Sequence, residues 1–333
     1  MEELITLDYG SGGKKTASLI EKLILPQLDN PALRQLGDGA VVPGGEELVF
    51  STDSFVVSPR FFPGGDIGKL AVCGTVNDIC MSGGEPRWLS LALILEEGLP
   101  AAELEQILSS VAKAAKEAGV CIVTGDTKVV EKGRGDGVYI NTAGIGVLRQ
   151  PGLSPRAIRP GDRVLVSGTV GDHGAAVMLA RNQNLVQGEL KSDCAPLHRL
   201  CAALRQLGSD LRVLRDPTRG GVATTLCEFV EGTALSILLE EADIPVRPAV
   251  ASACDILGLD PLYCANEGKL LAVVAPERAE EALALLRGLP EGENAAVIGT
   301  VGEQWPGRVA VRTALGGTRI AAKLAGAQLP RIC

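Results

Sequence analysis

Residues 48–54 of the chain read Leu-Val-Phe-Ser-Thr-Asp-Ser, and residues 66–80 read Asp-Ile-Gly-Lys-Leu-Ala-Val-Cys-Gly-Thr-Val-Asn-Asp-Ile-Cys. The first stretch predicts a short apolar strand that leads into Asp53. The second predicts a helix with Asp66 as its N-cap residue. That helix is apolar apart from a few positions, and a carboxylate at Asp78 needs a polar partner there. A strand followed by a buried helix, each carrying an aspartate, predicts a mixed α and β fold with a polar site.

The same alternation continues outward along the chain. We expect helices at 14–25, 101–118, 172–180, 195–207, 221–231 and 277–286, and strands at 87–95, 120–123, 138–148, 163–167, 235–240, 269–275 and 296–302. Pro151, Pro155 and Pro160 cluster between the two halves and mark a boundary. We therefore predict an α+β protein with an α/β-like N-terminal half, divided into domains at 1–150 and 151–313. Residues 314–333 show no strong periodicity and are expected to form a mobile tail.

The composition excludes several classes of protein. The chain has 333 residues, of which 46% are apolar and 22% charged, as in ordinary globular proteins. No run approaches the roughly 18 apolar residues of a membrane span, and the start at Met1 lacks the pattern of a signal peptide. The net charge of −8 and the 3% aromatic content disfavour nucleic-acid binding. We expect a cytoplasmic protein with no membrane and no nucleic-acid partner.

Nine cysteines and two histidines limit the metal and redox chemistry. No cysteine pair has C-x-x-C spacing, and two histidines nearly exclude a multi-histidine metal site. Eight internal cysteines are expected to be buried packing residues, as free cysteines usually are. Cys333 differs because it is the last residue of the sequence, where a thiol on a mobile tail can enter and leave a pocket. A terminal cysteine without a function is the alternative.

A glycine-rich segment precedes the first helix. Gly10-Ser11-Gly12-Gly13-Lys14 could hold phosphate oxygens through backbone N–H groups, the helix N-terminus and the lysine charge. It is not a P-loop, because the G-x-x-x-x-G-K-[ST] pattern is absent. The alternative is a turn in an N-terminal arm.

Four aspartates are candidates for a shared site. Asp38 lies between two glycines, Asp53 and Asp126 follow predicted strands, and Asp78 lies in the helix predicted at 66–80. Carboxylates in such places suit Mg²⁺, which prefers carboxylate oxygens together with substrate phosphates and water. Lys128 follows Asp126 and Thr127 and could contact a phosphate. A single aspartate beside glycine usually makes a turn, but four together favour a nucleotide–magnesium site.

Two further segments lie in the second half. Asp216-Pro217-Thr218-Arg219-Gly220-Gly221 precedes a helix, and Arg219 could contact a phosphate or could be a surface residue beside a helix cap. Glu267 precedes a strand and could be a buried general base or a turn residue.

Several motifs, in chain order, resemble those of the HypE family of hydrogenase maturation proteins. This family belongs to the superfamily of aminoimidazole ribonucleotide (AIR) synthetase, selenophosphate synthetase and thiamine monophosphate kinase. The aspartate-rich loops are typical of the superfamily, and the Pro-Arg-Ile-Cys end is typical of HypE. The segments that carry the resemblance are residues 7–14, 36–40, 51–54, 76–79, 125–130, 216–221, 266–268 and 330–333.

The resemblance implies a two-domain AIR-synthetase-like fold and an ATP-dependent dehydratase. N-terminal domains would pair across a homodimer into a β-barrel, and the C-terminal domain would be an α+β sandwich. The terminal cysteine would receive a carbamoyl group from the carbamoyltransferase HypF. Dehydration would turn the S-carboxamide into an S-cyanide, which passes to iron on the HypC–HypD complex.

The resemblance also implies roles for residues. Cys333 would be the carrier, Glu267 a candidate base, and Lys128 a phosphate contact. The four aspartates would hold ATP and Mg²⁺, and Gly12, Lys14, Thr127 and Arg219 complete the expected nucleotide site. A small-molecule kinase and a non-catalytic scaffold are the alternatives, and the former needs no terminal cysteine.

Overall fold

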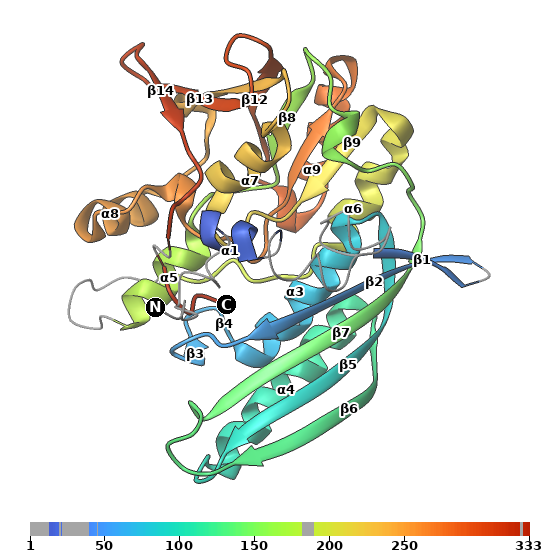
Figure 1. Cartoon of the computed structure of the whole chain (residues 1–333), viewed down its shortest axis with the longest axis vertical. Coiled ribbons are helices and arrows are strands. Elements are labelled where there is room, and N and C mark those ends of the chain that lie inside the picture. Colours follow the sequence, from blue (N-terminus) through green and yellow to red (C-terminus); the bar gives the residue numbers. More distant parts are fainter. Residues whose placement is uncertain (1–12, 20, 22–39, 45, 182–189, 327–328) are drawn as a thin grey trace.

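The structure is a computed structural model that describes residues 13–19, 21, 40–44, 46–181, 190–326 and 329–333. These residues form two halves, each built on a β-sheet with helices packed against it (Figure 1). No helix in these ranges is both long enough and apolar enough to span a membrane.

The N-terminal half contains a five-stranded sheet in the order β1-β2-β7-β5-β6. All neighbours are antiparallel except β5 and β6, which are parallel and joined through helix α4. Its elements are α1 (Lys14–Leu19), β1 (Ala40–Gly44), β2 (Glu46–Phe55), α3 (Ile67–Met81), β5 (Gly84–Glu96), α4 (Ala101–Ala118), β6 (Cys121–Val130) and β7 (Val138–Leu148), with a small β3–β4 pair at Phe61–Phe62 and Gly65–Asp66.

Helix α3 lies between this sheet and the C-terminal half. Asp66 caps it, because its carboxylate accepts hydrogen bonds from the backbone N–H groups of Gly68 and Lys69. Thirteen of its 15 residues are buried, as expected of a helix that is apolar on nearly all sides. One continuous hydrophobic core therefore runs from the sheet through α3 into the second half.

The C-terminal half contains a seven-stranded sheet in the order β14-β13-β10-β12-β8-β11-β9. Helices α5, α6, α7, α8 and α9 accompany it (Figure 1). The bounds are β8 (Arg163–Val166), α5 (Asp172–Arg181), α6 (His198–Leu204), β9 (Leu211–Arg215), α7 (Gly221–Val230), β10 (Ser236–Glu240), α8 (Pro248–Leu257), β11 (Leu271–Val274), α9 (Ala279–Arg287), β12 (Ala296–Gly302), β13 (Arg308–Arg312) and β14 (Thr318–Ala321).

The structure confirms the α+β class and most predicted elements, and it corrects several. The strand predicted at 120–123 extends to Val130, so Asp126 lies within β6 rather than after a strand. β1, β3, β4, β9, α8, β13 and β14 were not predicted. The unpredicted strands are short, and β13 becomes a strand because it pairs with β10, which is distant in sequence, while β14 pairs with β13. The predicted helix at 14–25 is described only in part, as α1.

Two further expectations need correction. The segment 314–333 is not without regular structure, because Thr318–Ala321 forms β14 against β13. Seven of the eight internal cysteines are buried as expected, but Cys121 is exposed. It lies on the edge strand β6, whose described side chains are largely exposed.

Candidate functional site

A cavity of about 200 Å³ is lined by residues of both halves. β2 and α3 contribute one wall, and two loops and the chain end of the second half contribute the other. The lining residues are Thr52, Asp53, Gly74, Asp78, Asp216, Thr218, Arg219, Glu267 and Cys333.

The first wall brings two of the predicted aspartates together. Side chains alternate along β2, so Ser51 and Asp53 face α3. The Ser51 hydroxyl donates to the Asp78 carboxylate at 2.8 Å, which gives the helical aspartate its polar partner. Burial raises the pKa of Asp53, against the opposing charge of Arg219. Gly74 leaves room for the ring of Phe55, because an added Cβ would lie 2.9 Å from it.

The loop before α7 supplies the positive charge. Gly220 and Gly221 both have positive φ, at 77° and 61°, which glycine adopts without a steric penalty. An added Cβ on Gly221 would lie 2.5 Å from the main-chain oxygen of Leu262. This turn directs Arg219 toward the cavity. Its pKa is raised by its neighbours, Cys333 first and then the carboxyl groups including Asp53.

Glu267 is a strongly perturbed carboxyl of the cavity. It is 2% exposed, and burial, followed by the nearby Cys194 and Asp216, raises its pKa well above the ordinary value. Within the described part of the chain, its Oε1 has no hydrogen-bond partner. A carboxyl in this state takes up a proton more readily than a solvated one.

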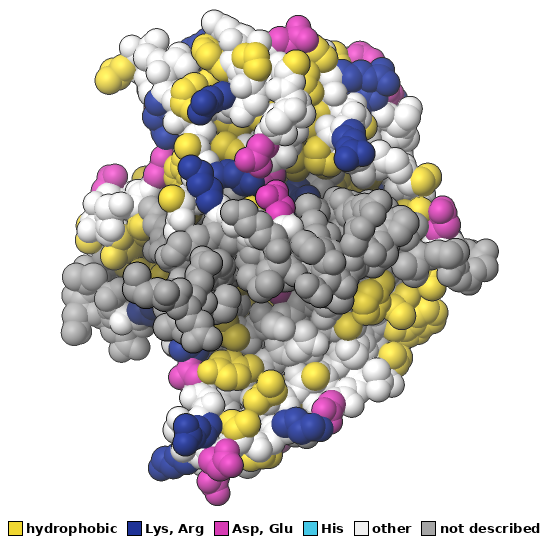
Figure 2. Space-filling view, in the orientation of Figure 1, with side chains coloured by type: hydrophobic (Ala, Val, Ile, Leu, Met, Phe, Trp, Pro, Cys, Tyr) yellow, Lys and Arg dark blue, Asp and Glu magenta, His cyan; other side chains and the backbone are white. Residues whose placement is uncertain are grey.

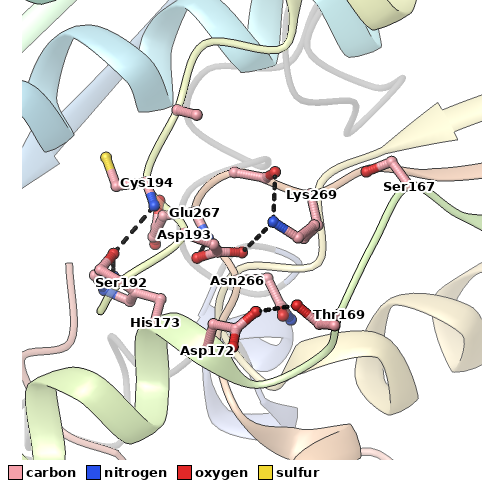
Figure 3. Close-up of polar contacts among 12 residues, drawn as sticks. Ser167, Thr169, Asp172, His173, Ser192, Asp193, Cys194, Asn266, Glu267 and Lys269 are labelled. Carbon is pink, nitrogen blue, oxygen red and sulfur yellow. Dashed lines mark hydrogen bonds and ion pairs between the residues drawn. The ribbon is translucent and has the colours of Figure 1, made fainter. Parts of the chain in front are cut away.

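The main chain around Glu267 is fixed from three sides. Its N–H donates to Asp193 Oδ1 at 3.1 Å, and its carbonyl accepts from Asn77 Nδ2 at 3.3 Å. The neighbouring Asn266 side chain binds the main chain of Gly171 and Pro217. Figure 3 shows Asp193 beside Glu267, with Lys269 paired to Asp193 at 3.5 Å. The loop is therefore held in one position relative to α3.

The last residue enters the same cavity. The main-chain oxygen of Cys333 accepts a hydrogen bond from Val56 N at 3.1 Å, and the preceding Ile332 is 3% exposed in the core. The pKa of the Cys333 thiol is raised by burial and by the negative charge of Glu267, while Arg219 acts in the opposite direction. The thiol is thus held as the protonated group beside a carboxyl of high pKa.

Comparisons with known proteins agree with this geometry. Residues 36–148 match the model of the AIR synthase related protein N-terminal domain, and residues 159–312 match that of the C-terminal domain. The carbamoyl dehydratase HypE of Cupriavidus necator is 51% identical over 332 residues, covering 99% of this chain and 95% of the relative. The chain belongs to the HypE family of carbamoyl dehydratases.

Solved structures of this family have the same fold. The crystal structure of a HypE protein in complex with ATP is 50% identical, with a TM-score of 0.83, and the match covers 99% of this chain and 100% of that one. The HypE component of a HypE–HypF complex is 48% identical, with a TM-score of 0.87 over 92% of this chain and 100% of that one.

In this HypE-family chain, the other predicted residues lie elsewhere. Asp126 and Lys128 form an exposed ion pair at 2.6 Å on β6 and are not part of the cavity. Within one copy of the chain, Asp126 therefore lies apart from Asp53 and Asp78, and its predicted role in the nucleotide site stays a prediction. Thr127 lies in β6, and its side chain is not among those described. Lys14 is exposed on α1, whereas Gly12 and Asp38 lie outside the described residues.

The structure adds cavity residues that were not predicted as site residues, namely Thr52, Gly74, Asp216 and Thr218. Asp216 and Thr218 stand in the same quoted segment as Arg219, so proximity in that turn was an available signal. Thr52 stands beside Asp53 in the quoted segment 51–54, so the same signal was available for it. Gly74 carries no comparable signal, because only the packing of α3 on β2 brings it to the cavity.

Proposed function

We propose that this chain catalyses the ATP-dependent dehydration of a carbamoyl group carried on the Cys333 thiol, which yields a thiocyanate. The observation that carries the proposal is the position of the Cys333 thiol in one cavity with Glu267. A substrate held on the chain itself makes the reaction effectively intramolecular.

The first step activates the carbamoyl oxygen, which is a poor leaving group. The oxygen attacks the γ-phosphorus of ATP and the bond from that phosphorus to ADP breaks. The amide nitrogen releases one of its two protons to solvent, which gives an imidate phosphate. Arg219 neutralises charge on the phosphoryl group as it moves. Its raised pKa keeps it positive throughout.

The second step forms the carbon–nitrogen triple bond. Glu267 takes the remaining N–H proton, the nitrogen electron pair forms the new π bond, and the C–O bond breaks as phosphate leaves. Burial raises the pKa of Glu267, and a base whose pKa approaches the working pH is effective in proton transfer. Bound ATP and the carbamoyl group would displace water from the cavity, which would otherwise consume ATP without forming product.

Asp53 and Asp78 would hold Mg²⁺ together with the ATP phosphates. The described residues offer no group of three or more His, Cys, Asp or Glu side chains able to bind a metal alone. Two cavity carboxylates nevertheless fit Mg²⁺, which usually takes one or two carboxylates plus phosphate and water oxygens. The ion would supply charge neutralisation to phosphoryl transfer. Gly12, Lys14 and Asp38 remain proposed ATP-binding residues.

The outer face of the N-terminal sheet supports a homodimer. Phe50, Ile145, Trp88 and Cys121 form one cross-strand row on the face away from α3, and Phe50 and Trp88 are 42% and 46% exposed. Figure 2 shows hydrophobic side chains gathered over this end of the sheet. Such an exposed apolar row favours association. We propose that this face pairs with a second copy to close a β-barrel.

The same face carries Asp126 and Lys128, whose register partners Ala92 and Ile94 belong to β5. We therefore propose that Asp126, Thr127 and Lys128 serve the ATP site of the partner subunit. Mixing inactive Asp78→Asn and Asp126→Asn proteins tests this. About one quarter of wild-type activity is expected, because half of the dimers are mixed and each retains one intact site. A mixture as inactive as its components contradicts the proposal.

The remaining proposals follow from the carrier role. HypF would load the thiol and HypC–HypD would accept the cyanide, in the cytoplasm.

We propose a domain at 1–150, a second at 151–313 and a tail at 314–333, and the matched ranges 36–148 and 159–312 support the first two. Because β14 is anchored in the sheet, movement of the tail would begin after Ala321.

Mass spectrometry of the C-terminal peptide tests the function. The protein is incubated with HypF, carbamoyl phosphate and ATP, and Cys333 is expected to gain a carbamoyl group and then lose one water. Cys333→Ala should bind ATP and show neither change. Absence of any mass change at Cys333 with active HypF present would falsify the proposal.

A further inference from the structure

We propose that His173 and Arg181 of helix α5 form a docking site for the end of the chain, and that His173 is a positioning residue for the reaction. The inference rests on the proposed function, because its purpose is to hold the Cys333 thiol against Glu267. It concerns residues that lie outside the cavity lining.

Both residues bind the main chain of the last residues. His173 Nε2 lies 2.8 Å from the carbonyl oxygen of Ile332, and the Arg181 guanidinium donates to the carbonyl oxygen of Arg331. Arg181 also donates to the carbonyl oxygen of Ser58. One helix therefore holds two consecutive peptide groups of the chain end, from positions about two turns apart.

The protonation state of His173 follows from its partners. A carbonyl only accepts, so Nε2 carries the proton, and Nδ1 accepts from the Ser192 hydroxyl at 2.8 Å. The Ser192 oxygen accepts in turn from Cys194 N at 3.1 Å. Burial lowers the pKa of His173, which keeps the ring neutral. Every polar atom of the histidine ring is thus satisfied only when the chain end is docked.

The same segment that fixes His173 also fixes Glu267. Figure 3 shows Ser192 beside His173 and Asp193 beside Glu267, and Asp193 accepts from the Glu267 N–H at 3.1 Å. An added Cβ on Gly268 would lie 1.8 Å from the main-chain oxygen of Asp193, so the two segments are in direct contact. Residues 192–194 therefore contact both His173, which binds the chain end, and Glu267, the proposed base, and they fix the two relative to each other.

The docked end also runs alongside residues 56–58. Val56 N donates to Cys333 O and Ser58 N donates to Arg331 O, each at 3.1 Å, and Arg331 Nε donates to Val56 O at 3.0 Å. Arg331 adopts a φ of +53°, which turns the chain into the cavity. None of these contacts uses the Cys333 sulfur, so the thiol can carry a carbamoyl group while the end stays docked.

Thiol labelling measures docking directly. In a Cys121→Ser background, the rate at which iodoacetamide alkylates Cys333 reports how often the chain end leaves the cavity. Loss of one buried hydrogen bond is expected to raise this rate about five- to tenfold in His173→Leu. Dehydration of the carbamoylated protein should slow as well, by at most this factor, with ATP affinity unchanged.

Two variants separate docking from general damage. His173→Gln places an amide N–H near the same carbonyl and should restore most of the protection. His198→Leu removes the other histidine, which does not contact the chain end in the described structure, and should label at the wild-type rate. Wild-type labelling in a folded His173→Leu protein, or no recovery in His173→Gln, overturns the inference. If labelling responds as expected while the wild-type protein forms no thiocyanate, the proposed function fails and the docking site stands.

Discussion

We expect the buried Glu267, the proposed general base, to lower the stability of the fold, and Glu267→Gln tests this. The carboxyl is 2% exposed, lacks a partner for Oε1 among the described residues, and lies near Asp193, Asp216 and Asp53. A neutral amide of the same shape removes the cost of holding a negative charge there. We expect the variant to lose the base and to gain stability.

The magnitude depends on pH. Unfolded glutamate ionises at a pKa of about 4.3, whereas burial raises the pKa of folded Glu267 well above that value. Between these two values the folded protein holds a proton that the unfolded chain has lost. Wild-type stability therefore falls as pH rises through this window, by up to about 1.4 kcal/mol per pH unit, and levels off above the folded pKa. Glutamine has no such dependence, so the advantage of the variant grows with pH.

Urea unfolding of both proteins at a series of pH values from about 4 to 8 measures this difference. Glu303→Gln, which changes an exposed glutamate of the same half, is the matched control and should shift the unfolding free energy by less than about 0.5 kcal/mol. The dehydration rate of Glu267→Gln should fall by about two to four orders of magnitude, the usual contribution of a general base.

A stability difference that is constant with pH would refute the reasoning, because the buried charge would then not be its source. A variant that becomes less stable than wild type as pH rises would show that ionised Glu267 is a net stabiliser. Retention of the wild-type dehydration rate would remove Glu267 from the mechanism altogether.

Three further outcomes follow from the site. Arg219→Met should weaken ATP binding about tenfold by calorimetry, because it removes the cation that we propose contacts the phosphates; unchanged affinity would place Arg219 outside the nucleotide site. Gly268→Ala should lower the unfolding free energy by about 1–3 kcal/mol, since its Cβ would meet Asp193 O at 1.8 Å, whereas Gly288→Ala, with its nearest contact at 3.4 Å, should be nearly neutral in the same denaturation experiment. Chelation of divalent ions should stop thiocyanate formation and added Mg²⁺ should restore it, and activity that survives chelation would exclude the metal role of Asp53 and Asp78.

Local sequence was sufficient for elements whose pattern is complete within one segment. The residues from Asp66 to Cys80 include both the N-cap and the apolar side chains that are buried, and α3 begins and ends close to the predicted residues. β13 and β14 differ, because their strand conformation depends on pairing with residues far along the chain. A short segment that gains its hydrogen bonds from distant partners has no local signal strong enough to predict it.

In the site, the sequence predicted the type of residue but not the direction in which its side chain points. Asp78 and Asp126 both looked like magnesium ligands, since each is an aspartate in or beside a regular element. Asp78 faces β2 and the cavity because α3 is packed against that sheet. Asp126 faces outward because its register partner on β5 is Ala92, on the side of the sheet opposite α3. Residue type predicted the same chemistry for both, and only the packing of the helix on the sheet shows that they lie on different faces.

Two adjacent residues of α3, Asn77 and Asp78, contact different parts of the molecule. Asp78 contributes to the cavity, while Asn77 donates to the carbonyl oxygens of Ala195 and Glu267 and accepts from Leu197 N. Successive positions on a helix point about 100° apart, so one helical turn can supply a cavity carboxylate, Asp78, and also bind the loop that holds Glu267. The two halves are therefore aligned through α3 itself, and the distance from Asp78 to Glu267 is fixed by one buried helix rather than by a flexible connection.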